Sequence, residues 1–250
     1  MIKITETVKH LIIINVIMFV GMMLFQGKGD LFNNWFALYF PGNDAFKPWQ
    51  IITHMFMHGN VMHIFFNMLA LWMFGSAVEQ RLGNKKFLFI YFSAGLGAVL
   101  FQLGYYYFQY YSLESSLLQS GITLTEIKDI LTTNRSARTF TSVQMADIQS
   151  LFDVFYASMV GASGCIMGIL VAFGMMNPNA KLMMIFLPIP IKAKYFIPGI
   201  IILDVISAFS GQSFFSPSNT AYMAHVGGAL TGFIIMWYWK KNQFNQNRWD

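Results

Sequence analysis

The length of its apolar segments is the feature that most restricts how this chain can fold. A helix that crosses a lipid bilayer needs about 20 mainly apolar residues. Six segments approach this length: 10–26, 61–78, 86–108, 157–176, 195–210 and 222–239. Charged residues make up 11% of the chain, whereas soluble domains contain about 25%. The sequence predicts an all-α polytopic membrane protein, a single domain over residues 1–250 built as a bundle of six transmembrane helices.

Three of the connections between these helices have a distinctive composition. Residues 27–60 are rich in aromatic side chains, which favours a loop lying in the membrane interface after the first helix. Residues 109–156 form a long outer loop between the third and fourth helices, with short helices expected at 122–133 and 143–155. Residues 181–194 are apolar but interrupted by Pro188 and Pro190, so we expect an interfacial excursion and not a span.

The positive charges give the orientation. Alternating the loops between two sides puts 11 Lys and Arg residues on the side of both termini and five on the other, which together are the 16 in the chain. Because cytoplasmic loops are enriched in Lys and Arg, both termini are expected in the cytoplasm and the chain in the inner cell membrane. The first apolar segment lacks a clear cleavage site and is expected to be retained. Without a clustered basic patch, we expect no nucleic-acid partner.

Two motifs at predicted helix starts supply a candidate nucleophile and base. Residues 161–164, Gly-Ala-Ser-Gly, lie near the start of the fourth helix, where backbone N–H groups have no intrahelical partner. His225 is followed on its own face by Gly228 and Gly232, which let a neighbouring helix approach closely. We predict that Ser163 is the nucleophile and His225 its base. A helix over 157–176 would place Ser163 about 9 Å below the outer surface.

The second helix supplies candidate groups for stabilising an oxyanion. His63 and Asn67 are four residues apart and so share a helical face. Acyl transfer needs donors directed at the developing oxyanion, and we predict that these are the His63 ring, the Asn67 amide and the backbone N–H of Ser163. Gly161 removes steric bulk where a substrate carbonyl approaches. His58 is expected to line the path by which water enters.

Other polar side chains receive lesser roles. Asp204 is the only carboxylate in the last three predicted helices, and a bare Ser–His pair is favoured over a triad that includes it. His54 and His58 have the spacing of a metal-ligand pair, but no His-Glu-x-x-His motif or membrane carboxylate completes a site. We therefore expect no metal and no cofactor, and place His54 in the interface. The competing interpretation of Ser163 is a small packing residue in a helix contact.

Four motifs in order resemble those of the rhomboid family of intramembrane serine proteases, across most of the chain from residue 49 to 239. In chain order, HxxxxHxxxN is formed by His58, His63 and Asn67, and ExRxG by residues 79–83. GxSG is formed by residues 161–164, and AHxxGxxxG by residues 224–232. The resemblance implies a six-helix fold with a Ser–His dyad in a water-filled cavity open to the outer face. It also implies hydrolysis of peptide bonds in or near the transmembrane helices of membrane-protein substrates.

Two positions depart from that family's pattern. The family often has an aromatic ring four residues after the serine, stacked on the catalytic histidine; Met167 stands there in this chain, which predicts a less firmly held base. The family's Trp-Arg pair before the second helix reads Trp49-Gln50, which leaves its anchoring role open. The alternative function is a non-catalytic relative that binds and escorts transmembrane segments. A transporter is disfavoured because no inverted repeat is found.

Overall fold

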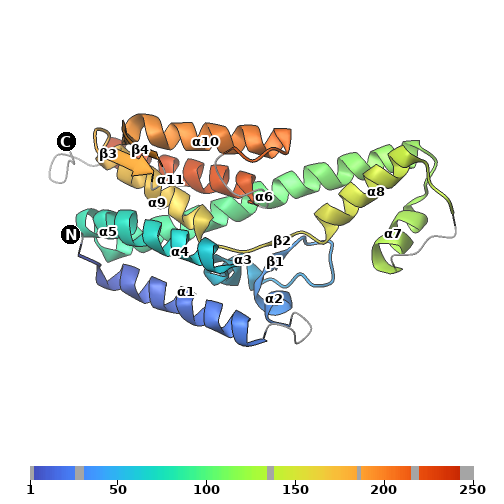
Figure 1. Ribbon diagram of the computed structural model, residues 1–250, viewed down its shortest axis with the longest axis horizontal. Coiled ribbons are helices and arrows are strands. Elements are labelled where there is room, and N and C mark those ends of the chain that lie inside the picture. The colour runs from blue at the N-terminus through green and yellow to red at the C-terminus, as the bar shows by residue number, and fades with distance from the viewer. Residues whose placement is uncertain (1–2, 26–30, 134–137, 185–186, 215–219, 243–250) are drawn as a thin grey trace.

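The computed structural model describes residues 3–25, 31–133, 138–184, 187–214 and 220–242, and this part of the chain is mostly helical (Figure 1). The long helices are α1 (Glu6–Phe25), α6 (Asn84–Gln119), α9 (Ser163–Met176), α10 (Ala193–Ser210) and α11 (Tyr222–Asn242). One further stretch joins α4 (Val61–Ala70), the π-helical turn η2 (Leu71–Gly75) and α5 (Ser76–Leu82). The short helices are α2 (Leu31–Phe36), α3 (Gln50–Thr53), the 3-10 turn η1 (His54–Phe56), α7 (Leu124–Thr133) and α8 (Ser142–Phe155).

Four helical stretches in the described part of the chain are long and apolar enough to cross a membrane: Glu6–Phe25, Val61–Leu82, Asn84–Gln119 and Ala193–Ser210. Helix α9 is also apolar but has 14 residues, a length of about 21 Å. The predicted polytopic, mainly helical membrane fold is confirmed at this level. The count of six spans stays a prediction.

Helices α9 and α11 pack with their backbones in contact. A Cβ added to Gly228 of α11 would lie 2.0 Å from the carbonyl oxygen of Gly164 on α9, and one added to Gly232 would lie 2.6 Å from the Cα of Gly168. Helix α6 meets the other side of α11 equally closely, since a Cβ on Gly227 would lie 2.5 Å from a carbonyl oxygen of α6. Without side chains to separate them, these three helices form the centre of the bundle.

The C-terminal part of α6 carries a separate lobe (Figure 1). The prediction that the third helix ends at residue 108 was wrong, because α6 continues to Gln119. Helices α7 and α8 cover this extension, with a small apolar core that includes Leu117, Ile127 and Leu151. Burial of that core explains why a sequence too polar for the membrane stays helical.

Two small antiparallel sheets interrupt the helical pattern, and the all-α prediction missed both. Strand β1 (Leu38–Tyr39) pairs with β2 (Ser158–Met159), which joins the first connection to the segment before α9. Strands β3 (Lys181–Met184) and β4 (Leu187–Lys192) form a hairpin where the interfacial excursion was expected. Their extended backbone agrees with the two prolines of that segment, because proline destabilises a helix interior.

Gln50 stabilises the conformation of the connection between α1 and α4. It is fully buried, and its Nε2 donates hydrogen bonds of 2.9 Å to the carbonyl oxygens of Asn34 and Ala45. Its Oε1 accepts from the backbone N–H groups of Tyr39 and Lys47. This glutamine is therefore an internal brace for the loop, which explains why an uncharged residue suits the position.

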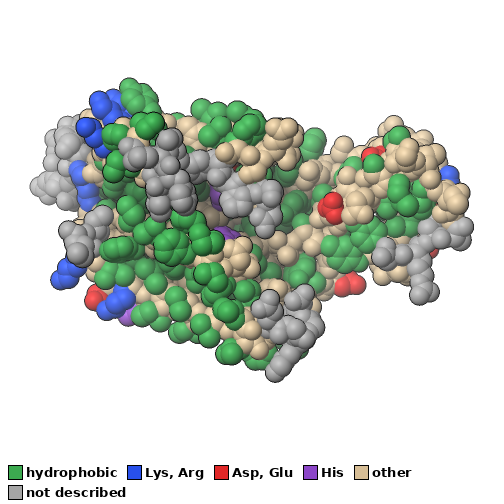
Figure 2. Space-filling model, in the orientation of Figure 1, with side chains coloured by type: hydrophobic (Ala, Val, Ile, Leu, Met, Phe, Trp, Pro, Cys, Tyr) green, Lys and Arg blue, Asp and Glu red, His purple; other side chains and the backbone are tan. Residues whose placement is uncertain are grey.

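Glu79 of α5 caps the start of α1. Its carboxylate accepts hydrogen bonds from the backbone N–H groups of Thr7 and Val8, at 3.2 and 3.1 Å, and from the Thr5 hydroxyl. A carboxylate at this end complements the helix dipole. In the face shown in Figure 2, Lys and Arg side chains gather at this end of the molecule, and most Asp and Glu side chains lie on the opposite lobe.

Candidate active site

Ser163 is the first residue of α9, so the prediction of a helix from residue 157 was wrong. Gly161 has φ of +128°, a conformation that only glycine adopts readily. Its N–H donates to the carbonyl oxygen of His54 at 2.9 Å. The chain is extended at Ser158–Met159 and turns at Gly161 before it enters α9, so the depth estimate that assumed a helix from residue 157 loses its basis.

His54 is buried inside the protein, and its predicted place at the depth of the membrane interface stays a prediction. His54 is 2% exposed, and its Nδ1 lies 2.8 Å from the carbonyl oxygen of Gln50. Because its own carbonyl receives the Gly161 N–H, His54 ties the segment before Ser163 to the turn before His58.

His63, Asn67 and Gly161 lie close together. A Cβ on Gly161 would lie 2.8 Å from His63 Nε2 and 3.8 Å from Asn67 Nδ2. His63 Nδ1 accepts the N–H of Gly59 at 3.4 Å, which favours the tautomer that carries its proton on Nε2. Asn67 Nδ2 is buried and has no hydrogen-bond partner in the described part of the chain. Two N–H donors thus face the space left by the missing Gly161 side chain.

His58 packs against His63, with ring centroids 5.0 Å apart in an edge-to-face arrangement. The residue is fully buried, and neither ring nitrogen finds a partner among the residues that the structure describes. Buried polar atoms in proteins are usually satisfied. Both nitrogens of His58 are thus enclosed by protein atoms beside His63.

His225 makes a hydrogen bond to Asp204, although the sequence favoured a bare Ser–His pair. Its Nδ1 lies 2.8 Å from Oδ2 of Asp204 on α10, and Asp204 is completely buried. The signal that could have found this contact is the carboxylate itself, because an ionisable group inside a membrane helix usually has a partner and a function. Asp204 therefore belongs to the candidate site.

Ser163 and His225 occupy facing ends of two helices that touch. A Cβ on Gly164, the residue after Ser163, would lie 3.5 Å from the carbonyl oxygen of Ala224, the residue before His225. His63 also lies within electrostatic range of His225. Among the described residues, no hydrogen bond joins Ser163 to His225. Catalytic hydrogen bonds are often long in unliganded enzymes and tighten when substrate binds.

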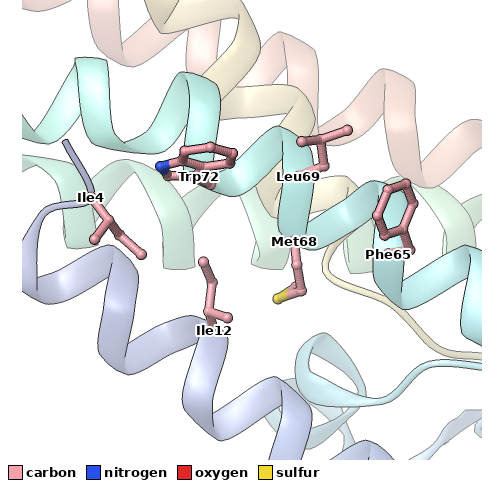
Figure 3. Close-up of a pocket in the computed structure, with 6 residues that line it drawn as sticks. All are labelled: Ile4, Ile12, Phe65, Met68, Leu69 and Trp72. Atoms are coloured by element: carbon pink, nitrogen blue, oxygen red, sulfur yellow. The ribbon is translucent and has the colours of Figure 1, made fainter. Parts of the chain in front are cut away.

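Two cavities differ in their relation to this site. One, of about 230 Å³, includes Gly59 and Val160 in its lining and so lies next to the His63 and Gly161 cluster. The other, of about 480 Å³, lies between α1 and α4 (Figure 3), where Ile12 and Met68 point toward one another from opposite sides. Its lining is apolar and holds none of the candidate residues. The lining of the smaller cavity holds none of them either, but Gly59 bonds His63 and Val160 precedes Gly161, so this cavity is the one that adjoins the cluster.

Comparison with known proteins relates residues 45–242 to the Rhomboid domain family. The chain is 28% identical to rhomboid protease AarA of Providencia stuartii over 197 residues, which is 75% of this chain and 54% of that protein. It is 46% identical to rhomboid protease GlpG of Salmonella newport over 56 residues, 22% of this chain and 20% of that protein. The chain thus matches about half the length of AarA and a fifth of GlpG.

Proposed function

Because the chain belongs to the rhomboid family, we propose that it is an intramembrane serine endopeptidase that hydrolyses peptide bonds in or near transmembrane segments. The relatives are named as rhomboid proteases, and the residues needed for acyl transfer to a serine are present in this chain. The observation that carries the proposal is the backbone contact beside Ser163 and His225, where Gly164 approaches Ala224.

The reaction starts at the end of α9. His225 Nε2 takes the proton of the Ser163 hydroxyl as Oγ attacks the scissile carbonyl carbon. Negative charge develops on the carbonyl oxygen in the space beside Gly161. There the Nε2–H of His63, the Nδ2–H of Asn67 and the backbone N–H of Ser163 donate hydrogen bonds to it.

Collapse of this intermediate breaks the C–N bond. The imidazolium of His225 gives its proton to the leaving amine, and an acyl-enzyme ester remains on Ser163. Water then attacks the ester with His225 again acting as base, which releases the acid and restores the serine. We assign the entry path of that water to the region around His63, where the His58 ring packs edge-on.

The setting of this reaction is the lipid bilayer. We assign the chain to the inner membrane as a single six-helix domain with both termini cytoplasmic and the site open to the outer face. The concentration of Lys and Arg at the end where α1 begins supports this orientation. The partners are membrane proteins with a transmembrane helix.

Reconstitution into proteoliposomes with a single-span reporter tests the proposal. Cleavage is expected for the wild type and for Ser150→Ala, whose side chain bonds only the backbone of exposed α8. It is expected to be lost in Ser163→Ala and His225→Ala. A fluorophosphonate should label Ser163 in the wild type but not in His225→Ala. Cleavage that survives Ser163→Ala would refute the mechanism, and reporter binding without cleavage by the wild type would favour the escort function.

A further inference from the structure

We propose that Asp204 is a positioning residue that holds the His225 ring with its proton on Nδ1 and its Nε2 facing Ser163. This inference rests on the proposed function and adds a third member to a site that the sequence suggested has two. It starts from the 2.8 Å contact between His225 Nδ1 and Asp204 Oδ2.

The environment of Asp204 determines which group holds the proton. Asp204 is 0% exposed and lies six residues before the end of α10. An ionised carboxylate in such a place is costly unless it is hydrogen-bonded and paired. The contact with the His225 ring supplies such a partner to an ionised Asp204. A carboxylate has no donor of its own, and the Nδ1–H of His225 therefore donates to it.

This hydrogen bond settles the tautomer of the base. A neutral imidazole carries one proton, and with that proton on Nδ1 the Nε2 atom is an acceptor. Only an acceptor nitrogen can remove the proton of the Ser163 hydroxyl. When Nε2 takes that proton, the ring becomes an imidazolium and its new charge faces the Asp204 carboxylate. Asp204 receives no proton and touches no substrate atom.

A single helix fixes both partners of the contact. Tyr105 of α6 donates its hydroxyl to the carbonyl oxygen of Ala208 at 2.6 Å, one turn after Asp204. Gln102, one turn earlier on α6, accepts the N–H of Ala224 at 3.1 Å, one residue before His225. Because α6 binds α10 near Asp204 and α11 near His225, it fixes the distance between the Asp204 carboxylate and the His225 ring.

The first test reads the tautomer directly in the wild-type protein. Ring-nitrogen NMR of histidine-labelled protein, with the His225 signal assigned by its loss in His225→Gln, should show Nδ1 protonated and Nε2 unprotonated at neutral pH. This readout needs no change at Asp204 and no enzymatic activity. A His225 ring protonated on Nε2 alone would overturn the inference.

The second test is kinetic and uses Asp204→Asn, which keeps the shape of the side chain. An amide can donate to Nδ1 and so select the wrong tautomer. In soluble serine proteases the same change lowers kcat about 10,000-fold. We expect kcat for the proteoliposome reporter to fall at least about tenfold, with little change in KM. A smaller fall, or a change confined to KM, would contradict the role of Asp204.

Ser207→Ala is the matched control. Ser207 is one turn from Asp204 on the same helix, is buried, and its Oγ has no partner among the described residues. Its loss should leave kcat and the tautomer of His225 unchanged, whereas a purely structural effect of altering α10 would appear in both variants. If the wild type does not cleave, or Ser163→Ala still does, the proposed function fails, while the NMR experiment still decides the Asp204 contact.

Discussion

The backbone N–H of Gly161 donates a 2.9 Å hydrogen bond to the carbonyl oxygen of His54, and this bond joins the two halves of the proposed oxyanion site. On one side of it the chain enters α9 at Ser163, and on the other it continues through His58 to α4. The relation between Ser163 and His63 therefore depends on a main-chain contact, which side-chain substitutions in the surrounding loops leave in place.

Gly161→Ala should abolish most activity. Alanine rarely adopts the φ of +128° found here, and its Cβ would lie 2.8 Å from the His63 ring. Displacing this donor is expected to lower kcat about 100- to 1,000-fold, measured with the proteoliposome reporter. Gly104→Ala on α6 is the control, because the added Cβ would lie more than 4 Å from the described residues other than its own neighbouring helix backbone. Equal activity of the two variants would contradict the assignment of this site.

Gly228→Ala should destabilise the whole bundle. The added methyl would lie 2.0 Å from the carbonyl oxygen of Gly164, and a backbone atom cannot move aside as a flexible side chain can. We expect a loss of at least about 1–3 kcal/mol in the free energy of unfolding, measured by denaturation in mild detergent. If Gly228→Ala were as stable as Gly104→Ala, the close contact of α9 and α11 would be contradicted.

Glu79→Gln should loosen α1 from the rest of the protein. The change removes the charge from a buried acceptor of three hydrogen bonds, and bonds to charged groups contribute about 1.5–3 kcal/mol each. We expect a loss of about 1–3 kcal/mol in unfolding free energy. Glu6→Gln is the comparison, because the Glu6–Lys9 pair is exposed and should contribute less than about 1 kcal/mol. Similar losses in both variants would refute the capping role.

Acid should destabilise α7 more than it destabilises α11. The backbone N–H of Thr123, assisted by the Thr123 hydroxyl, lowers the pKa of Glu126 from its usual 4.5. A lowered pKa in the folded state means that the carboxylate stabilises the lobe above about pH 4.5 and loses this effect as the pH falls further. Hydrogen exchange of residues 124–133, corrected for intrinsic rates, should therefore rise more below pH 4 than exchange in α11. In Glu126→Gln this additional rise should be absent.

The sequence predicts helices well where apolar length alone decides them. Helix α10 was expected at 195–210 and lies at Ala193–Ser210. The beginning of α9 was missed because a hydrogen bond from Gly161 to a distant carbonyl, and the pairing of β2 with β1, hold residues before Ser163 extended. The end of α6 was missed because tertiary packing, and not local pattern, keeps its polar part helical.

The candidate site was predictable to the extent that its residues share an element. His63 and Asn67 lie on one helix, so their common face follows from spacing. The contact between Asp204 and His225 joins α10 to α11, and no periodicity within either helix reports how two helices are rotated against each other. The roles of Ser163 and His225 stay a prediction until the reporter and labelling experiments are done.

The glycine contact between α9 and α11 also bears on how the protein responds to its membrane. Membranes differ in thickness, and helices adjust to this by tilting. Because the main chains of α9 and α11 touch at Gly164 and Gly228, these two helices must tilt as one body. A thinner or thicker bilayer would then shift the height of the reaction relative to a substrate, and so change where the substrate is cut, while Ser163 and His225 keep their distance.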